Sequence, residues 1–426
     1  MKTRKRILYL IFLAMLWAPL LQMWTHLFPQ QKLYGAYTQH TKPELTAKNW
    51  FSGDFQYDYT RYLNDTLGFH ADMVKFRNYC CYKLFHTANA FGILIGKEDY
   101  LYEMGYIQTK NGEEYVGTPK IKEYIHQAKA LDEFLSNKGK TLIIVLAPNK
   151  ADLYPEYIPK RYLRPATDST NYKQFSKLLK ASGLNVIDFN DWFLKKKATA
   201  SYPLFPKYGI HWSEYGMLMA ADSLISYIEQ IQHTPLAHLV FDGNEISTTP
   251  SASDFDIGKT LNLPDNTLNP FALCYPKWHW QQDSNYNRPK AIVIADSFYW
   301  QLFNIGFQQH CLDGQFWYYY KTIYPDSYDH ELTVEDINVR QAINDNDIVM
   351  LIITSIGLKD KKKKGSVVRL KKELPDKEII NKAPIKRPHA IKAEDNIAKD
   401  SARDIHPKPH PKAKMILKEK DPEKNK

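Results

Sequence analysis

The most constraining feature of the chain is an alternation of short apolar runs with longer amphipathic stretches between about residues 121 and 354. The apolar runs, which predict strands, lie at 141–147, 185–188, 291–295 and 347–354. The amphipathic stretches, which place apolar side chains on one face of a helix, lie at 121–138, 171–181 and 215–231. Because parallel strands need crossover helices, this order predicts an α/β fold with a mainly parallel sheet.

A second constraint lies at the N-terminus, where a basic cluster at residues 2–6 precedes an apolar run at residues 7–24. The run is about long enough to cross a bilayer, and the basic cluster should stay in the cytoplasm. No clear small-x-small cleavage site follows it, which favours an uncleaved anchor over a cleaved signal peptide. We therefore expect residues 1–28 to anchor a single-pass protein in the cell inner membrane, with its main domain on the periplasmic or extracytoplasmic side.

The net charge of +10 is concentrated at the C-terminus. Residues 359–426 contain 22 Lys and Arg against 11 Asp and Glu, which leaves 35 basic and 36 acidic residues elsewhere. A nearly neutral folded region argues against nucleic acid as a partner. The tail is basic and lacks aromatic residues, so we expect it to be disordered, with contact to an anionic envelope polymer or lipid as a secondary reading.

The remaining chain divides into two parts. Residues 29–120 are interpreted as an N-terminal subdomain, and residues 121–358 as the α/β domain. Within the latter, residues 237–287 break the alternation with Pro, Asn, Asp and aromatic residues, which predicts a loop-rich insertion. Such segments often carry binding surface.

The cysteines give no sign of a metal site. They are Cys80, Cys81, Cys274 and Cys311, and their spacing matches no common zinc motif. We therefore expect no metal and no cofactor. A bridge between Cys274 and Cys311 is compatible with an oxidising compartment, but nothing in the sequence requires it.

Polar residues at the ends of the predicted strands are the candidates for a site, because ligands bind there in open α/β sheets. Ser297 is the strongest of them, since the run 291–295 delivers it to a sharp strand-to-helix turn. Backbone N–H groups at a helix start can hold a developing oxyanion. A helix cap is the alternative role. The full set is Asn149, Lys150, Asp188, Asp296, Ser297, Thr354 and Ser355.

A nucleophilic serine needs a base, and His211 is the most distinctive histidine. It lies with Trp212 between Gly209 and Gly216, immediately before a predicted helix. A packed loop histidine is the alternative reading. Together with Ser297, however, His211 suggests acyl transfer.

Several segments resemble the SGNH-hydrolase-like polysaccharide O-acetyltransferases of the alginate type. Residues 295–298, Ala-Asp-Ser-Phe, resemble the family's Gly-Asp-Ser-Phe nucleophile block, and residues 209–212, Gly-Ile-His-Trp, resemble its Asp-x-His-Trp block. Residues 96–102 look like its Gly-Lys-Asp-Gly-Trp-Leu-Phe segment, and Pro148 with Lys150 is a weaker fourth match. The resemblance spans roughly residues 60–355 in the right order, and it implies an SGNH-like three-layer fold.

The resemblance implies that Ser297 is the nucleophile and His211 the general base and then acid. An acetyl group would pass through an acyl-serine to a hydroxyl of an extracytoplasmic polysaccharide. Its donor would be supplied by a membrane-bound O-acyltransferase. We also expect a substrate-binding role for Lys150, Asn149, Trp212 and Asp296.

The main departure from the family is Gly209, which stands where the family has Asp. A carboxylate normally holds the catalytic imidazole in the correct tautomer. We expect Asp188 to replace it, with Glu214 as a second candidate. Two other functions stay open: an acetylesterase acting on polysaccharide or peptidoglycan, and a non-catalytic glycan-binding or assembly component.

Overall fold

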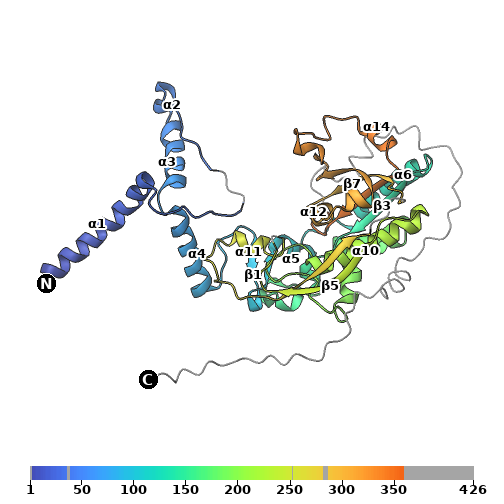
Figure 1. The fold of residues 1–426 in the computed structure, drawn as a ribbon, viewed down its shortest axis with the longest axis horizontal. Helices are drawn as coiled ribbons and strands as arrows, with labels where there is room; N and C mark the ends of the chain where they lie inside the picture. The colour runs from blue at the N-terminus through green and yellow to red at the C-terminus, as the bar shows by residue number, and fades with distance from the viewer. Residues whose placement is uncertain (1, 36–38, 252, 282–285, 359–426) are drawn as a thin grey trace, which may run out of the picture.

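The computed structural model describes residues 2–35, 39–251, 253–281 and 286–358. The basic tail expected at residues 359–426 lies outside this part. In Figure 1, four N-terminal helices project from one side of an α/β domain. They are α1 (Lys2–Thr25), α2 (Ala47–Ser52), α3 (Asp54–Thr66) and α4 (His70–Phe85).

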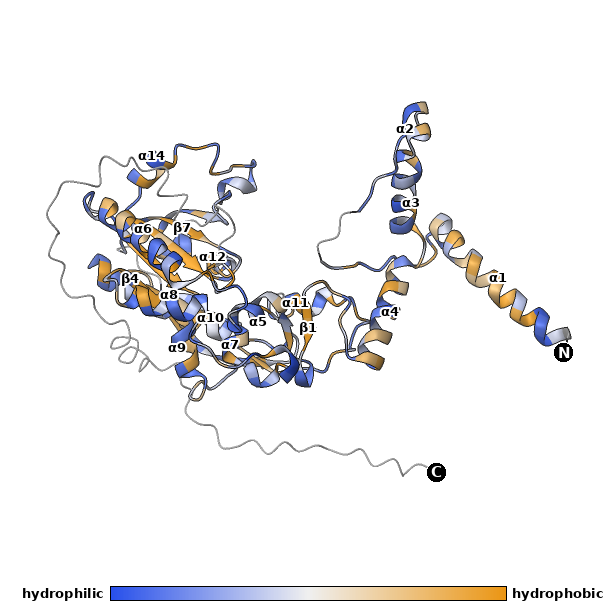
Figure 2. Cartoon of the chain, turned by 180° about the vertical axis from the view of Figure 1, so that it is seen from behind, coloured by the Kyte–Doolittle hydropathy of each residue, from blue (hydrophilic) through white to orange (hydrophobic). Residues whose placement is uncertain are grey.

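Helix α1 contains the whole apolar run. Within the described residues it is the one helix whose length and composition suit a membrane span, over Thr3–Thr25 with a mean hydropathy of 1.9. Figure 2 shows hydrophobic residues along most of the length of α1 and hydrophilic residues at its N-terminal end. Large apolar side chains such as Leu8 and Trp17 point away from the protein, which is the arrangement that a lipid environment stabilises.

Two contacts tie these helices together and to the domain. A Cβ atom at Gly68 would meet the Pro19 carbonyl and the Gln22 side chain, so glycine permits the close approach of α1. In α4, the Asn78 side-chain amide donates to the Leu261 carbonyl at 2.9 Å. The turn before α4 therefore contacts α1, and the middle of α4 contacts Leu261, directly after α11 (Asp256–Thr260).

The centre of the domain is a six-stranded sheet in the order β4-β3-β10-β7-β8-β9. Five strands run parallel, and β9 is antiparallel to β8. The four predicted strands are all present, and the α/β fold with a mainly parallel sheet is confirmed. The strands are β3 (Thr141–Leu146), β4 (Asn185–Asp188), β7 (Lys290–Ala295), β8 (Asp313–Tyr318), β9 (Thr322–Tyr324) and β10 (Ile348–Ile353).

Helices cover both faces of the sheet, because successive side chains of a strand point to opposite sides. In β3, Ile143 and Val145 join a core with α10 (Glu214–Gln232), whereas Leu142 and Ile144 join a core with α6 (Thr118–Ser136). The three predicted helices are confirmed. The third of them is α8 (Asn171–Lys180). The other α-helices that accompany the central sheet are α5 (Met104–Lys110), α7 (Lys150–Leu153), α9 (Phe189–Lys196), α12 (Tyr299–Asn304), α13 (Phe307–His310) and α14 (Val339–Asn344).

Part of the predicted N-terminal subdomain packs with the sheet. A short hairpin of β1 (Ile93–Ile95) and β2 (Leu101–Glu103) precedes α5. Tyr102 and Ile107 from this segment are buried in the same core as α10. Residues 93–110 therefore pack as part of the α/β domain, although the sequence places them before its boundary.

Residues 237–287, for which the sequence predicts a loop-rich insertion, contain regular structure, so the loop-rich prediction is wrong for much of this segment. Strands β5 (Leu239–Ser247) and β6 (Leu273–Trp280) pair antiparallel, and α11 (Asp256–Thr260) lies between them in the chain. Cys274 is a buried free thiol, as is Cys311, so the bridge compatible with the sequence is not formed. Burial raises the pKa of the Cys274 thiol to about 12.

Candidate active site

The nucleophile candidate, Ser297, lies at the carboxyl end of a central strand. It follows β7, which is hydrogen-bonded to β10 on one side and β8 on the other. The chain then turns into α12 after Phe298, and Phe298 is fully buried. Ser297 is therefore held at the carboxyl edge of the sheet by β7, which precedes it, and by the buried ring of Phe298, which follows it.

The base candidate, His211, comes from the segment before α10 and meets Ser297 directly. Its Nε2 lies 2.9 Å from the Ser297 Oγ. Ser213, two residues after the histidine, caps α10 by accepting from the Gly216 N–H at 3.1 Å, which fixes the start of the helix close to His211. The sequence expected these two side chains to work together, and the distance is suitable for proton transfer.

A carboxylate holds the other side of the imidazole, and it belongs to Asp256. Its Oδ2 lies 2.6 Å from the His211 Nδ1. Its Oδ1 accepts from the backbone N–H groups of Ile210 and Ile257 at 2.9 and 2.6 Å. A carboxylate fixed in this way orients the ring with Nδ1 protonated and leaves Nε2 to accept from the serine.

Asp256 corrects the expectation for Asp188, which the structure does not bring to His211. The Asp188 carboxylate accepts from Ser176 Oγ at 2.5 Å and from the Asp191 N–H at 3.0 Å, so it caps α9. Lys180 Nζ lies 3.5 Å from it. Glu214, the second candidate, is the first residue of α10, and burial raises its pKa.

The space at Gly209 explains why the carboxylate comes from elsewhere. A Cβ atom there would lie 2.6 Å from the Pro206 Cγ, 2.8 Å from the Ser253 carbonyl and 3.0 Å from the Asp254 carbonyl. The backbone of the insertion fills the place of an aspartate side chain at this position. The segment that leaves no room for a side chain at residue 209 therefore also carries the carboxylate of Asp256.

The comparisons with known proteins agree with the geometry. Residues 93–256 match the family described as "SGNH hydrolase-like domain, acetyltransferase AlgX". The resemblance to SGNH-like acetyltransferases is confirmed. This match includes His211 and Asp256, and Ser297 follows it in the chain.

One curated relative and several solved structures are similar to the chain. The "Probable alginate O-acetylase AlgJ" of Pseudomonas aeruginosa is 26% identical over 152 residues, which is 35% of this chain and 36% of that protein. The O-acetyltransferase domain of Pseudomonas putida AlgJ has 17% identity and a TM-score of 0.44, covering 66% of this chain and 99% of that one. For Pseudomonas aeruginosa AlgX the values are 13% and 0.41, with 66% and 67% covered. The alignment thus spans about a third of the curated relative.

Lys150, which the sequence assigns to substrate, is instead enclosed in the protein. It is 3% exposed, and its Nζ donates to the carbonyls of Leu101, Lys207 and Gly209 at 2.8, 2.9 and 2.9 Å. Burial lowers its pKa to about 7. Lys150 therefore joins β2 to the segment that leads into His211.

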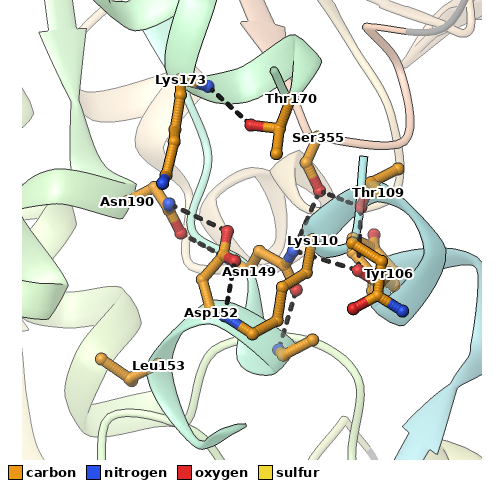
Figure 3. Close-up of polar contacts among 12 residues, drawn as sticks. Tyr106, Thr109, Lys110, Asn149, Asp152, Leu153, Thr170, Lys173, Asn190 and Ser355 are labelled. Atoms are coloured by element: carbon orange, nitrogen blue, oxygen red, sulfur yellow. Dashed lines mark hydrogen bonds and ion pairs between the residues drawn. The ribbon is translucent and has the colours of Figure 1, made fainter. Parts of the chain in front are cut away.

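Asn149 is likewise committed to structure. Its backbone N–H donates to Asn190 Oδ1 at 2.7 Å, and its side-chain amide donates to Ser355 Oγ at 3.2 Å. Figure 3 shows this network, in which Ser355 also meets Thr109 of α5. Asn149 thus connects the ends of β3 and β10 to α5 and α9.

Trp212 and Asp296 also make contacts within the protein that support the site. Trp212 is 0% exposed and packs against Phe189, Phe193 and Phe298. Asp296 accepts from Thr354 Oγ1 at 2.7 Å and from the Phe298 N–H at 3.1 Å, and burial raises its pKa. The residues expected to bind substrate therefore fix the turn of Ser297 and the ring of His211.

A second carboxyl group, that of Asp254, lies close to the triad without a hydrogen bond. The residue is 1% exposed, and neither carboxylate oxygen has a hydrogen-bond partner within the described ranges. Burial raises its pKa to about 6, although the nearby Tyr275 and Ser251 hydroxyls and the charge of His211 oppose that rise. The fold therefore stabilises the neutral acid relative to the carboxylate more than water does.

We expect Asp256→Asn to lower the rate of acetyl release from a chromogenic acetyl ester by about 10³-fold, because the amide cannot stabilise an imidazolium. Asp188→Asn is the matched comparison, since it removes a carboxylate of the same type away from His211. That variant should lose thermal stability and keep the rate per folded molecule. Equal rate losses in the two variants would contradict the assignment of Asp256.

Asp254→Asn should stabilise the protein at pH 7.5. With a folded pKa of about 6 above the ordinary value of about 3.9, the wild type is most favoured below pH 4 and loses this stability as pH rises through 6. Asn resembles the protonated acid, so the gain should be on the order of 2 kcal/mol at pH 7.5 and vanish near pH 4. Thermal melts across this range measure it, with the exposed Asp265→Asn as control.

Lys150→Met should destabilise the domain, because three backbone carbonyls lose their donor. We expect a loss of about 2 kcal/mol in the free energy of unfolding, measured by urea denaturation. The exposed Lys177→Met in α8 should change it by less than about 0.5 kcal/mol. A Lys150→Met protein as stable as wild type would show that these carbonyls need no donor.

Proposed function

We propose that the chain transfers acetyl groups to a hydroxyl of an extracytoplasmic polysaccharide through an acyl-serine intermediate. The observation that carries this proposal is the continuous chain of contacts from Asp256 through His211 to Ser297, at 2.6 and 2.9 Å. The family match of residues 93–256 to acetyltransferases supports the type of group transferred.

In the first half-reaction, Ser297 Oγ attacks the carbonyl carbon of the acetyl donor, and its proton passes to His211 Nε2. The leaving group departs with that proton, and the acetyl group stays on Ser297 as an ester. In the second half-reaction, His211 Nε2 takes the proton of the acceptor hydroxyl, and the hydroxyl oxygen attacks the carbonyl carbon of the acyl-serine ester. The proton then returns to Ser297 Oγ as the acetylated acceptor leaves.

Asp256 has two tasks in this cycle. Its charge stabilises the imidazolium that forms in each half-reaction. Its bonds to the backbone of Ile210 and Ile257 hold the carboxylate still, so that little reorganisation is needed when the charge develops.

The setting of the reaction follows from α1. We propose that this helix anchors the protein in the inner membrane, with the α/β domain in the periplasm. There it would receive acetyl groups from a membrane-bound O-acyltransferase. The length and apolar character of Thr3–Thr25 support the anchor. The curated relative's name, a probable alginate O-acetylase, supports a carboxylated polysaccharide as the class of acceptor.

An acetylesterase acting on polysaccharide or peptidoglycan is the second candidate, because the His211 side chain is 17% exposed and water can reach the acyl-serine. Water and a sugar hydroxyl compete for the same intermediate. The assembled Asp256–His211–Ser297 chain argues against a purely binding or assembly role, since such a role needs no oriented imidazole.

The proposal predicts that Ser297 becomes acetylated when the detergent-solubilised full chain meets an activated acetyl ester. Intact-mass spectrometry should find one acetyl adduct in the wild type, none in Ser297→Ala and little in His211→Ala. The exposed Ser52→Ala in α2 should react as the wild type does. Faster loss of the adduct with oligosaccharide than with buffer identifies a transferase, and equal loss identifies an esterase. A wild type without any adduct would overturn the proposal.

A further inference from the structure

A tyrosine that the catalytic chain does not use, Tyr319, lies beside the nucleophile. It follows β8, whose last residue, Tyr318, pairs with Ala295 of β7. The Tyr319 N–H donates to the Ala295 carbonyl at 2.9 Å. The Ser297 hydroxyl is close enough to the Tyr319 phenol to lower its pKa, while burial and the charge of Asp296 raise it to a net value of about 12.

The Tyr319 ring is nevertheless largely open to solvent. Its exposed fraction is 59%, whereas the next residue, Tyr320, is 7% exposed and belongs to the core beneath the sheet. Tyr320 therefore anchors the turn in the protein. Tyr319 is therefore the exposed aromatic residue of this turn, and it lies beside Ser297.

The backbone of this turn is strained. Tyr319 and Tyr320 have φ of 52° and 53°, a left-handed conformation that costs of order 1 kcal/mol or more for a non-glycine residue. Glycine adopts it freely, so the turn by itself does not need a tyrosine. Two aromatic residues in succession here indicate that the ring at 319 has a task that offsets the strain.

Neighbouring rings extend the surface. The centroids of Tyr318 and Tyr319 are 4.5 Å apart with an interplanar angle of 45°, and the Trp300 ring lies 5.4 Å from Tyr318. Trp300 belongs to α12, directly after the Ser297 turn. The strand β8 and helix α12 thus bring three aromatic rings into contact with one another, and Tyr319 is the one beside Ser297.

We propose that Tyr319 forms the acceptor subsite, on which a sugar ring of the polysaccharide packs while one of its hydroxyls faces Ser297. The C–H face of a pyranose is apolar and its hydroxyls point to the side, so an exposed aromatic face can bind the ring and leave the hydroxyls free. This inference rests on the proposed function, because it assigns the acceptor of the same site.

The subsite should act on the second half-reaction alone. An activated acetyl ester is small and reaches Ser297 without packing on Tyr319, so acylation does not depend on the ring. Transfer to a sugar depends on it, because the ring positions the attacking hydroxyl. Hydrolysis by water, which needs no platform, should be unchanged.

Two measurements on the detergent-solubilised full chain test this. The first is calorimetric binding of unacetylated oligosaccharides in a Ser297→Ala background, which excludes turnover; the panel is an oligouronate, a chitooligosaccharide and a neutral β-glucan oligosaccharide. The second is the rate at which the acetyl adduct on otherwise wild-type protein is lost to the bound oligosaccharide and to water.

The variants distinguish the effect of the Tyr319 ring from the effect of its hydroxyl and from a loss of stability. Tyr319→Gly relieves the left-handed strain and removes the ring, so it should keep the thermal stability while sugar affinity and transfer fall about tenfold. Tyr319→Phe keeps the ring and should bind and transfer as the wild type does. Tyr328→Ala is the control. It removes another exposed tyrosine, which packs on Tyr324 at the end of β9, and it should change neither the sugar affinity nor the rate of transfer.

Unchanged affinity and transfer in Tyr319→Gly would overturn the subsite, as would a loss in Tyr319→Phe equal to that in Tyr319→Gly. Failure of every oligosaccharide to bind would also overturn it. If Ser297 is never acetylated yet binding depends on the ring, the proposed reaction fails and the sugar subsite stands. The two proposals therefore fail separately.

Discussion

The site depends on one carboxylate that makes three contacts at once. Asp256 binds the imidazole of His211 through one oxygen and two backbone N–H groups through the other. The hydrogen bond from the Ile210 N–H fixes the loop that carries His211. Asp256 therefore both orients the imidazole ring and holds the backbone next to it. Lys150 also supports this loop, because its Nζ donates to the carbonyls of Lys207 and Gly209. Catalytic geometry is thus set by polar contacts to main chain rather than by side-chain packing alone.

The fold was predictable where its strands are aliphatic and enclosed. Strands β3, β7 and β10 read as continuous apolar runs because both faces of the sheet are covered. Strand β8 escaped prediction because it begins Asp-Gly-Gln and ends Phe-Trp-Tyr, a pattern without an aliphatic run. Residues 237–287 also looked irregular, since Pro276 and Gly243 lie within strands that form a separate two-stranded sheet in the described part of the chain. Sheets at the periphery leave weaker patterns than a central sheet does.

The site was predictable to the extent that local chain geometry creates it. A serine after a buried strand and a histidine before a helix have recognisable surroundings, and Ser297 and His211 meet as expected. Asp256 lies 45 residues from His211 in the chain, and no spacing rule links a carboxylate to an imidazole across an insertion. Lys150 and Asn149 were assigned to substrate because a polar residue after a strand looks the same whether it faces a ligand or a backbone carbonyl. Only the packed structure distinguishes these cases.

Asp256 belongs to α11, outside the elements that carry Ser297 and His211, and this position has a consequence for the energetics of the reaction. The sheet and its helices carry Ser297 and His211, so local opening of the segment around α11 leaves a folded protein whose serine lacks an oriented base. The fraction of active molecules then depends on the free energy of this local opening. That free energy is smaller than the free energy of unfolding of the whole domain. A ligand that bound only the closed form of this segment would therefore increase activity by mass action without touching the reacting atoms.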